Sequence, residues 1–184
     1  MRHSLMAVAL LLLGVLPAPG STAVVPVPWV GQKGSRDCGH AVLAMLIAWR
    51  KGDADGGAAA YKGLKLARNR MLALEDLRRV AAAHGMSLDF VAPDRVYILG
   101  MSPDASLLDE FRNVLSGPEP RPIIVAIKEQ ELPHYIILVG ATGAEFLARD
   151  PNPATKGRLR NLSNAELMRL MTGFGGISLK VSRR

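Results

Sequence analysis

The spacing of apolar positions divides this chain into a helical part and a later part with short strands. Apolar side chains recur at helical spacing from Cys38 to about Arg50, and again from Leu74 to His84. The second segment closes at Gly85, and a glycine just past the last periodic residue is typical of a helix end. A further helix is expected from Asp104 to about Leu115. The first part therefore predicts three helices.

After residue 120 the pattern changes to short β-branched or apolar runs separated by turn residues, which is typical of strands. The sequence Ser163-Asn164-Ala165-Glu166 has the form of a capping box and predicts a short helix through Met171. Helices followed by an antiparallel sheet are the layout of an α+β fold. The predicted strands are Ser87–Ala92, which precedes this part, Ile123–Ile127, Tyr135–Val139, Glu145–Arg149 and Ile177–Val181.

The first 23 residues have a pattern of their own. Arg2 and His3 precede the apolar run Leu5–Leu16, and proline and small residues follow as far as Ala23. This is the layout of a secretory signal, and the run is well short of the roughly 20 residues that a spanning helix needs. We expect residues 1–23 to be a signal peptide cut after Ala23, with an uncleaved membrane anchor as the alternative.

Residues 24–184 are then expected to form one exported domain without a membrane span, in the periplasm or outside the cell. The net charge is +7, but lysine and arginine are scattered and aromatic residues make up only 5%, so specific nucleic-acid binding is not expected. The sequence has no cysteine or histidine cluster with zinc-site spacing and no glycine-rich phosphate loop. We therefore expect neither a metal nor a cofactor.

Cys38 is the only cysteine of the chain and directly precedes the first apolar helix. A thiol at a helix N-terminus lies near unpaired backbone N–H groups and the positive end of the helix dipole, and both favour the thiolate. An odd cysteine in an exported protein indicates an intermolecular bridge or a free reactive thiol. We interpret Cys38 as a nucleophile.

A cysteine nucleophile needs a base to accept its proton. His40 lies two residues beyond Cys38 on the same helix, so we expect its side chain to point elsewhere. His84 lies at a helix end, where a histidine ring often interacts with the last carbonyl groups. His134, at the start of a predicted strand, is the remaining candidate outside the signal segment.

The base in turn needs an orienting group, and Asp150 follows the next predicted strand. If the strands Tyr135–Val139 and Glu145–Arg149 pair through the turn at 140–143, His134 and Asp150 become neighbours across the hairpin. Gln32 stands six residues before Cys38, on the loop that enters the helix. Its amide can donate a hydrogen bond to a developing oxyanion, together with the backbone N–H of the cysteine.

These motifs resemble the papain-like peptidases that cut after double-glycine leaders, the bacteriocin-processing family best known as the N-terminal domain of bacteriocin-exporting ABC transporters. The resemblance rests on the Gln-x5-Cys-Gly element that ends at Cys38 and Gly39, the His-Tyr pair at His134 and the Asp-Pro pair at Asp150. It extends from Val30 to Val181. It implies a papain-like fold in which N-terminal helices pack on a C-terminal antiparallel sheet.

The resemblance also implies roles for four residues: Cys38 as nucleophile, His134 as base, Asp150 as orienting group and Gln32 in the oxyanion hole. Familiar members are fused to a transporter, whereas this sequence contains no nucleotide-binding G-x-x-x-x-G-K-[ST] loop and begins with a predicted signal. We therefore expect a free-standing, exported cysteine peptidase that hydrolyses a peptide or protein, with a Gly-Gly-type leader as one candidate substrate and an envelope or exporter protein as one candidate partner.

Two alternatives share these residues. One is a peptide-binding module of the cell envelope that does not cleave its ligand. The other is a thiol acyl-transferase or cell-wall peptide hydrolase, because hydrolysis and acyl transfer use the same residues up to the acyl-enzyme.

Overall fold

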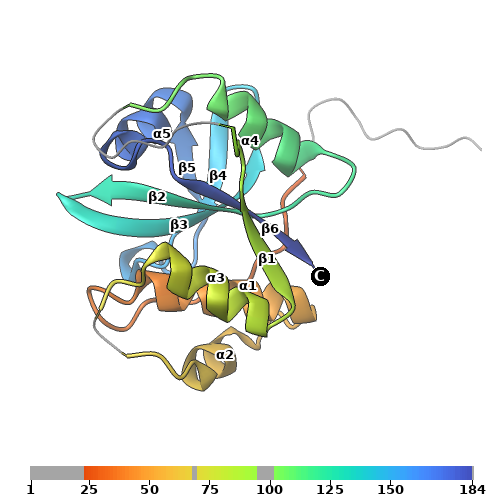
Figure 1. The fold of residues 1–184 in the computed structure, drawn as a ribbon, viewed down its shortest axis with the longest axis vertical. Coiled ribbons are helices and arrows are strands. Elements are labelled where there is room, and N and C mark those ends of the chain that lie inside the picture. Colours follow the sequence, from red (N-terminus) through yellow and green to blue (C-terminus); the bar gives the residue numbers. More distant parts are fainter. Residues whose placement is uncertain (1–22, 68–69, 95–101, 184) are drawn as a thin grey trace, which may run out of the picture.

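The computed structural model describes residues 23–67, 70–94 and 102–183 (Figure 1). Helices come first and most strands come later, as the pattern predicted. The elements are α1 (Cys38–Lys51), α2 (Gly57–Gly63), α3 (Leu74–Ala83), β1 (Met86–Phe90), α4 (Leu107–Ser116), β2 (Ile123–Glu129), β3 (Leu132–Ala141), β4 (Glu145–Arg149), β5 (Arg160–Ser163), α5 (Asn164–Met171) and β6 (Ser178–Arg183), with short 3-10 turns at Pro153–Thr155 and Thr172–Phe174.

The strands form one six-stranded sheet in the order β1-β6-β2-β3-β4-β5, and all of its pairings are antiparallel. The hairpin of β2 and β3 lies in the middle, so its residues are covered on both faces. This explains the nearly unbroken apolar run of β2, in which the first five positions are all buried. The α+β fold expected from the sequence is confirmed.

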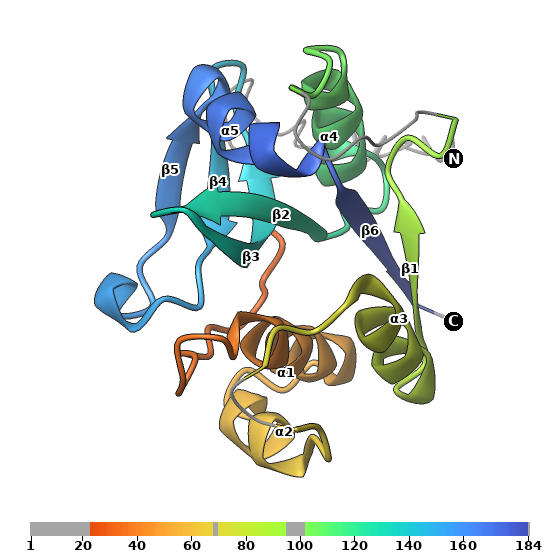
Figure 2. The ribbon, with the colours of Figure 1, turned by 60° about the vertical axis from the view of Figure 1, so that its left-hand side comes forward.

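Helices cover both faces of this sheet (Figure 2). On one face α1, α2 and α3 pack against alternate positions of the central strands, among them Ile124 and Ile137. On the other face α4 and α5 pack against the intervening positions, among them Ile123 and Ile136. The alternation of side chains along a strand thus divides the apolar interior into two clusters.

Helix α1 lies at the centre of the first cluster. Twelve of its 14 residues are buried, which is why its sequence is apolar almost all round. Leu72 packs closely against Gly39, and a β-carbon there would lie 3.1 Å from the β-carbon of Leu72, a tighter contact than usual. The helix ends at Gly52, which has a left-handed φ of 68°.

Several boundaries differ from the sequence predictions. The helix expected from Asp104 begins at Leu107, because residues 104–106 form a turn in which the Asp104 side chain accepts from the Ser106 N–H. Helix α2 and strand β5 were not predicted. Each has little apolar periodicity, with Leu162 the one fully buried residue of β5. The short helix predicted here and its N-cap at Ser163 are confirmed, since the Ser163 hydroxyl accepts from the N–H of Glu166 at 3.1 Å.

The expected signal peptide lies outside the described residues apart from Ala23, and it stays a prediction. Within the part of the chain that the structure describes, no helix has both the length and the apolar character needed to cross a membrane.

Candidate active site

Cys38 is the first residue of α1 and is almost completely buried, with 1% of its surface exposed. Asp37, just before it, anchors the start of the helix. Its carbonyl accepts from the Ala41 N–H at 3.0 Å, and its buried carboxylate accepts from the Tyr61 hydroxyl at 3.0 Å. The first N–H groups of a helix have no acceptor within the helix. The thiol therefore lies at the end of α1 that favours a negative charge.

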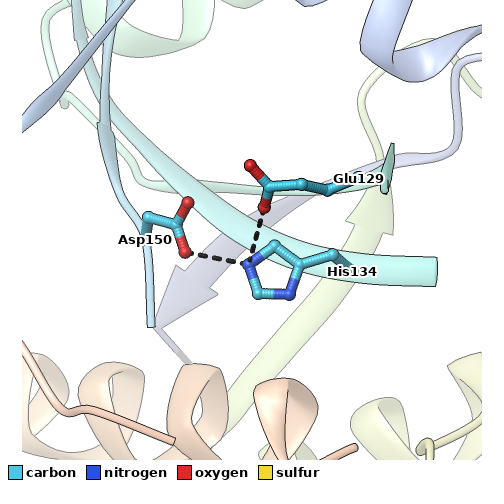
Figure 3. Close-up of side chains that lie close together, drawn as sticks. All are labelled: Glu129, His134 and Asp150. Carbon is cyan, nitrogen blue, oxygen red and sulfur yellow. Dashed lines mark hydrogen bonds and ion pairs between the residues drawn. The ribbon is translucent and has the colours of Figure 1, made fainter. Parts of the chain in front are cut away.

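His134 and Asp150 meet at the end of the sheet that faces α1 (Figure 3). The Nε2 atom of His134 lies 2.8 Å from Oδ1 of Asp150, and both side chains are buried. The pairing predicted from the strand ends is confirmed as a side-chain contact. The register differs from the prediction, in which His134 lies directly opposite Asp150. In the structure Ile137 lies opposite Arg149, and a bulge falls between Leu138 and Gly140. The histidine and the aspartate therefore meet diagonally.

The electrostatics of His134 bring Cys38 into the same site. Burial alone lowers the pKa of His134, but hydrogen bonds and charge interactions with Asp150 and Cys38 outweigh it and raise the pKa to about 9. Nε2 of the ring faces the two carboxylates, and the second ring nitrogen points away from them (Figure 3). The structure thus brings together three of the four residues predicted from the sequence.

Asp150 is held as a carboxylate by several groups. Burial raises its pKa, but the hydrogen bond and charge of His134, the Asn152 N–H and the Arg160 guanidinium together lower it. The Asn152 N–H donates to Oδ1 at 2.8 Å, and Arg160 Nη1 donates to Oδ2 at 3.0 Å. Every oxygen of this carboxylate therefore has a donor, as a buried charge requires.

The fourth predicted residue, Gln32, is attached to the loop that follows Asp150. The Gln32 N–H donates to the Pro151 carbonyl at 2.8 Å, and the nearby Trp29 Nε1 donates to the Asp150 carbonyl at 2.8 Å. The Oε1 atom of Gln32 is buried and has no hydrogen-bond partner within the described residues. The backbone of Gln32 is therefore held beside the segment that carries Asp150, and the side-chain oxygen is left without a donor from the part of the chain that the structure describes.

His40 does not act on the thiol from its place in α1. Its Nε2 atom lies 3.0 Å from the carbonyl of Ala67, and its side chain is fully buried. The expectation that this ring points elsewhere is confirmed. His84 follows the last residue of α3, where its backbone N–H donates to the Ala81 carbonyl.

Two charged residues at the site were missed by the sequence analysis. Glu129, at the end of β2, has a carboxylate oxygen 3.8 Å from Nε2 of His134. Arg160, at the start of β5, contacts both Glu129 and Asp150. The only available signal was their position at strand ends, and β5 itself was not predicted.

Glu129, His134 and Asp150 also form the kind of group that could bind a metal ion, since their potential ligand atoms lie within 4.8 Å of one another. The guanidinium of Arg160, however, already lies against both carboxylates, at 2.8 Å from Glu129 and 3.0 Å from Asp150. The cation of this cluster is therefore an arginine.

Comparisons with known proteins agree with this picture. No protein-family profile matches the chain. The sequence is 30% identical over 131 residues to the Mesentericin-Y105 transport/processing ATP-binding protein MesD of Leuconostoc mesenteroides. The match covers 68% of this chain but only 15% of MesD, so the chain spans a small part of that relative's length.

Solved structures match nearly the whole chain. The peptidase domain of Streptococcus ComA, a bifunctional ABC transporter involved in a quorum-sensing pathway, aligns with a TM-score of 0.58 and 22% identity, over 86% of this chain and 99% of that domain. A double-glycine-motif protease from an AMS/PCAT transporter, solved with its leader peptide, aligns with a TM-score of 0.58 and 20% identity, over 88% and 95%. The resemblance carried by the sequence motifs is confirmed: the chain has the papain-like α+β fold of the double-glycine leader peptidases.

Proposed function

We propose that this protein is a cysteine peptidase that hydrolyses a peptide bond in a peptide or protein substrate. The observation that carries the proposal is the position of His134, whose Nε2 atom lies 2.8 Å from the buried Asp150 and whose pKa is raised by interactions with both Asp150 and Cys38. A nucleophile, a base and an orienting group in this order are what thiol acyl chemistry requires. The fold shared with known peptidase domains supports the same reading.

In the proposed reaction the Cys38 thiolate attacks the carbonyl carbon of the scissile bond. The tetrahedral intermediate collapses, the C–N bond breaks, and the His134 imidazolium gives its proton to the leaving amine. Water, with His134 now acting as base, then attacks the thioester and releases the carboxylic acid together with the free enzyme. The high pKa of His134 suits the first step, because the ring is protonated when the amine must leave.

The negative oxygen of the tetrahedral intermediate needs donors. The backbone N–H of Cys38, at the start of α1, supplies one, and the side-chain amide of Gln32 is proposed as the other. The backbone N–H of Gln32 donates to the Pro151 carbonyl, and this places the residue beside the segment that carries Asp150, which supports the role.

The finer proposal concerns substrate and location. The solved relative with a leader peptide bound is a double-glycine-motif protease, and MesD is a transport/processing protein. We therefore extend the proposal to cleavage after a Gly-Gly-type leader, with an exporter or another envelope protein as partner. Because residues 1–23 have the layout of a secretory signal, the proposed site of action is the periplasm or the exterior of the cell.

The test compares wild type and Cys38→Ala on two synthetic peptides that differ only in carrying Gly-Gly or Ala-Ala before the bond to be cut. Mass spectrometry of the products should show cleavage of the Gly-Gly peptide by wild type and none by the variant. Cleavage by Cys38→Ala at the wild-type rate contradicts the proposal. A peptide that wild type binds but leaves uncut makes the chain a binding module, and an added amine that enters the product makes it an acyl-transferase.

Export has its own test. Expression of the full chain in a Gram-negative host, followed by N-terminal sequencing of the protein from the periplasm, should give a chain that begins at Val24. Recovery of the intact N-terminus from the membrane fraction would instead identify an anchor.

A further inference from the structure

Arg160 connects three carboxylates, those of Glu129 on β2, Asp150 just after β4 and Glu166 on α5, and two of them face the His134 ring. Its Nη1 atom donates to Glu129 Oε1 at 2.8 Å and to Asp150 Oδ2 at 3.0 Å, and its Nη2 atom donates to Glu166 at 3.3 Å. The Arg160 side chain is mostly buried, with 22% of its surface exposed. An arginine held by three acceptors has little freedom to leave the cluster.

Glu129 makes this arrangement necessary. Its second oxygen lies 3.8 Å from Nε2 of His134, the nitrogen that already bonds Asp150 at 2.8 Å. Two carboxylates therefore face one imidazole nitrogen within a group of atoms that all lie within 4.8 Å. Like charges this close disfavour the ionised form of one partner unless a cation lies between them. Nη1 of Arg160 contacts both carboxylates and supplies this positive charge.

The oxygens of Asp150 are divided between the two partners. Oδ2 accepts from Arg160, and Oδ1 accepts from His134 and from the Asn152 N–H. The guanidinium thus fixes the rotation of the carboxylate, and the carboxylate in turn fixes the ring. The orientation of the ring that interacts with Cys38 is thus set by this chain of contacts.

We propose that Arg160 is a positioning residue, which holds Asp150 and Glu129 together as two ionised carboxylates at Nε2 of His134 and so keeps the ring directed toward Cys38. The role rests on the proposed function, in that it assumes His134 acts on the Cys38 thiol. It does not depend on the substrate, because every contact that supports it lies within the chain.

The other groups that face His134 do not replace this cation. Among the described residues, the groups that interact with the ring are Cys38, at the start of α1, and the carboxylates of Glu129 and Asp150, and none of the three is a cation. Loss of the guanidinium would therefore leave two carboxylates without their cation. The expected result is a higher pKa for Asp150, whose pKa Arg160 helps to lower. Asp150 would then take up a proton, and release His134, at a higher pH than in wild type.

The experiment uses the single cysteine of the chain as a probe. The rate at which iodoacetamide alkylates Cys38 is measured from pH 4 to 9 by intact mass, so that no substrate is needed. In Arg160→Met we expect the acid limb of this profile to move upward by about one pH unit, the lower end of the effect of a nearby charge. Arg160→Lys, which keeps the positive charge, should stay within a few tenths of a unit of wild type.

The double variant Arg160→Met with Glu129→Gln separates charge from structure. Removal of the Glu129 charge relieves the repulsion, so the acid limb of the double variant should return toward the wild-type position. If the two substitutions only damaged packing, the double variant would be shifted further than Arg160→Met. Arg79→Met is the matched control, since Arg79 pairs with Asp76 at 2.6 Å in an exposed position far from the ring in sequence, and its profile should match wild type.

An acid limb of Arg160→Met that coincides with wild type overturns the proposal, and so does a double variant shifted as far as the single one. If Arg160→Met does not fold, Arg160→Gln, which keeps a donor but no charge, takes its place with the same expected shift. A wild-type protein that cleaves no peptide but gives these shifted profiles contradicts the proposed function and leaves the role of Arg160 standing. If wild type cleaves the peptide but the alkylation profiles of wild type and Arg160→Met coincide, the proposed function stands and the role of Arg160 is contradicted.

Discussion

Cys38 and His134 belong to two regions of the molecule that are stabilised in different ways. The cysteine begins a helix in which 12 of 14 residues are buried, mostly among apolar neighbours. The histidine lies at an end of the sheet where Glu129, Asp150 and Arg160 form a connected set of ion pairs. Packing fixes where the thiol is, and charge fixes the protonation and direction of the ring that serves it.

This difference means that the two regions should respond differently to substitution. Apolar truncation in α1 should change the free energy of unfolding with little change in the chemistry of the folded protein. Substitution in the ionic cluster should change the pH dependence and the rate more than the stability.

The largest effect is expected for Cys38→Ala. Peptide cleavage should fall on the order of 1,000-fold or more, because no other group of the site can form the acyl-enzyme. The melting temperature should change little, since the substitution removes one sulfur atom and keeps the helix. Product analysis by mass spectrometry and thermal unfolding check both statements. A variant that retains a tenth of the wild-type rate contradicts the role of Cys38.

On the sheet side, Asp150→Asn should lower the rate of cleavage about 100-fold or more. The amide no longer stabilises the imidazolium, and Glu129 at 3.8 Å from Nε2 supplies only part of the lost charge. The variant Asp150→Asn with Glu129→Gln should lose a further factor of about 10. Steady-state kinetics on all three proteins measure this, and equal rates in the single and double variants would show that Glu129 is not part of the cluster's function.

On the helix side, Leu43→Ala should lower the free energy of unfolding by about 3 kcal/mol, because Leu43 is fully buried in α1 and the truncation leaves a cavity. The folded variant should still be alkylated at Cys38 with the wild-type pH profile. Leu159→Ala, at an exposed position, is the control and should change stability by less than about 0.5 kcal/mol. Chemical denaturation gives both values, and a shifted alkylation profile in Leu43→Ala would mean that packing and charge are not separate.

A smaller effect is expected in the pH dependence of stability. The folded pKa of His134 is about 9 and its ordinary value is 6.5, so its contribution to stability is complete below about pH 6.5 and is lost as the pH rises through 9. Asp150 has a lowered pKa, so its contribution is present above 3.8 and is lost as the pH falls through the folded value. We therefore expect the melting temperature of wild type to decline between pH 7 and 10, and His134→Gln to lose this decline. An unchanged decline would assign it to other groups.

The sequence predicted the helix side better than the ionic cluster. Helix α1 is apolar enough to be recognised by period alone, and His134 and Asp150 were found because each stands at the end of a clear strand. Arg160 could not be found in this way, because β5 has a single fully buried residue. Its sequence therefore lacks the alternation of apolar and polar positions that predicts a strand. The diagonal contact of His134 with Asp150 depends on the bulge between Leu138 and Gly140. The spacing of apolar residues in the sequence did not predict this bulge.

The charged end of the sheet is expected to activate the thiol at the N-terminus of α1. The most direct measurement is the rate of alkylation of Cys38 by iodoacetamide at about pH 6, in wild type and in His134→Ala, with intact mass as the readout. Wild type should react about tenfold faster or more, because the His134 imidazolium adds to the N-terminus of α1 in stabilising a negative sulfur. Equal rates in the two proteins would contradict this activation of the thiol.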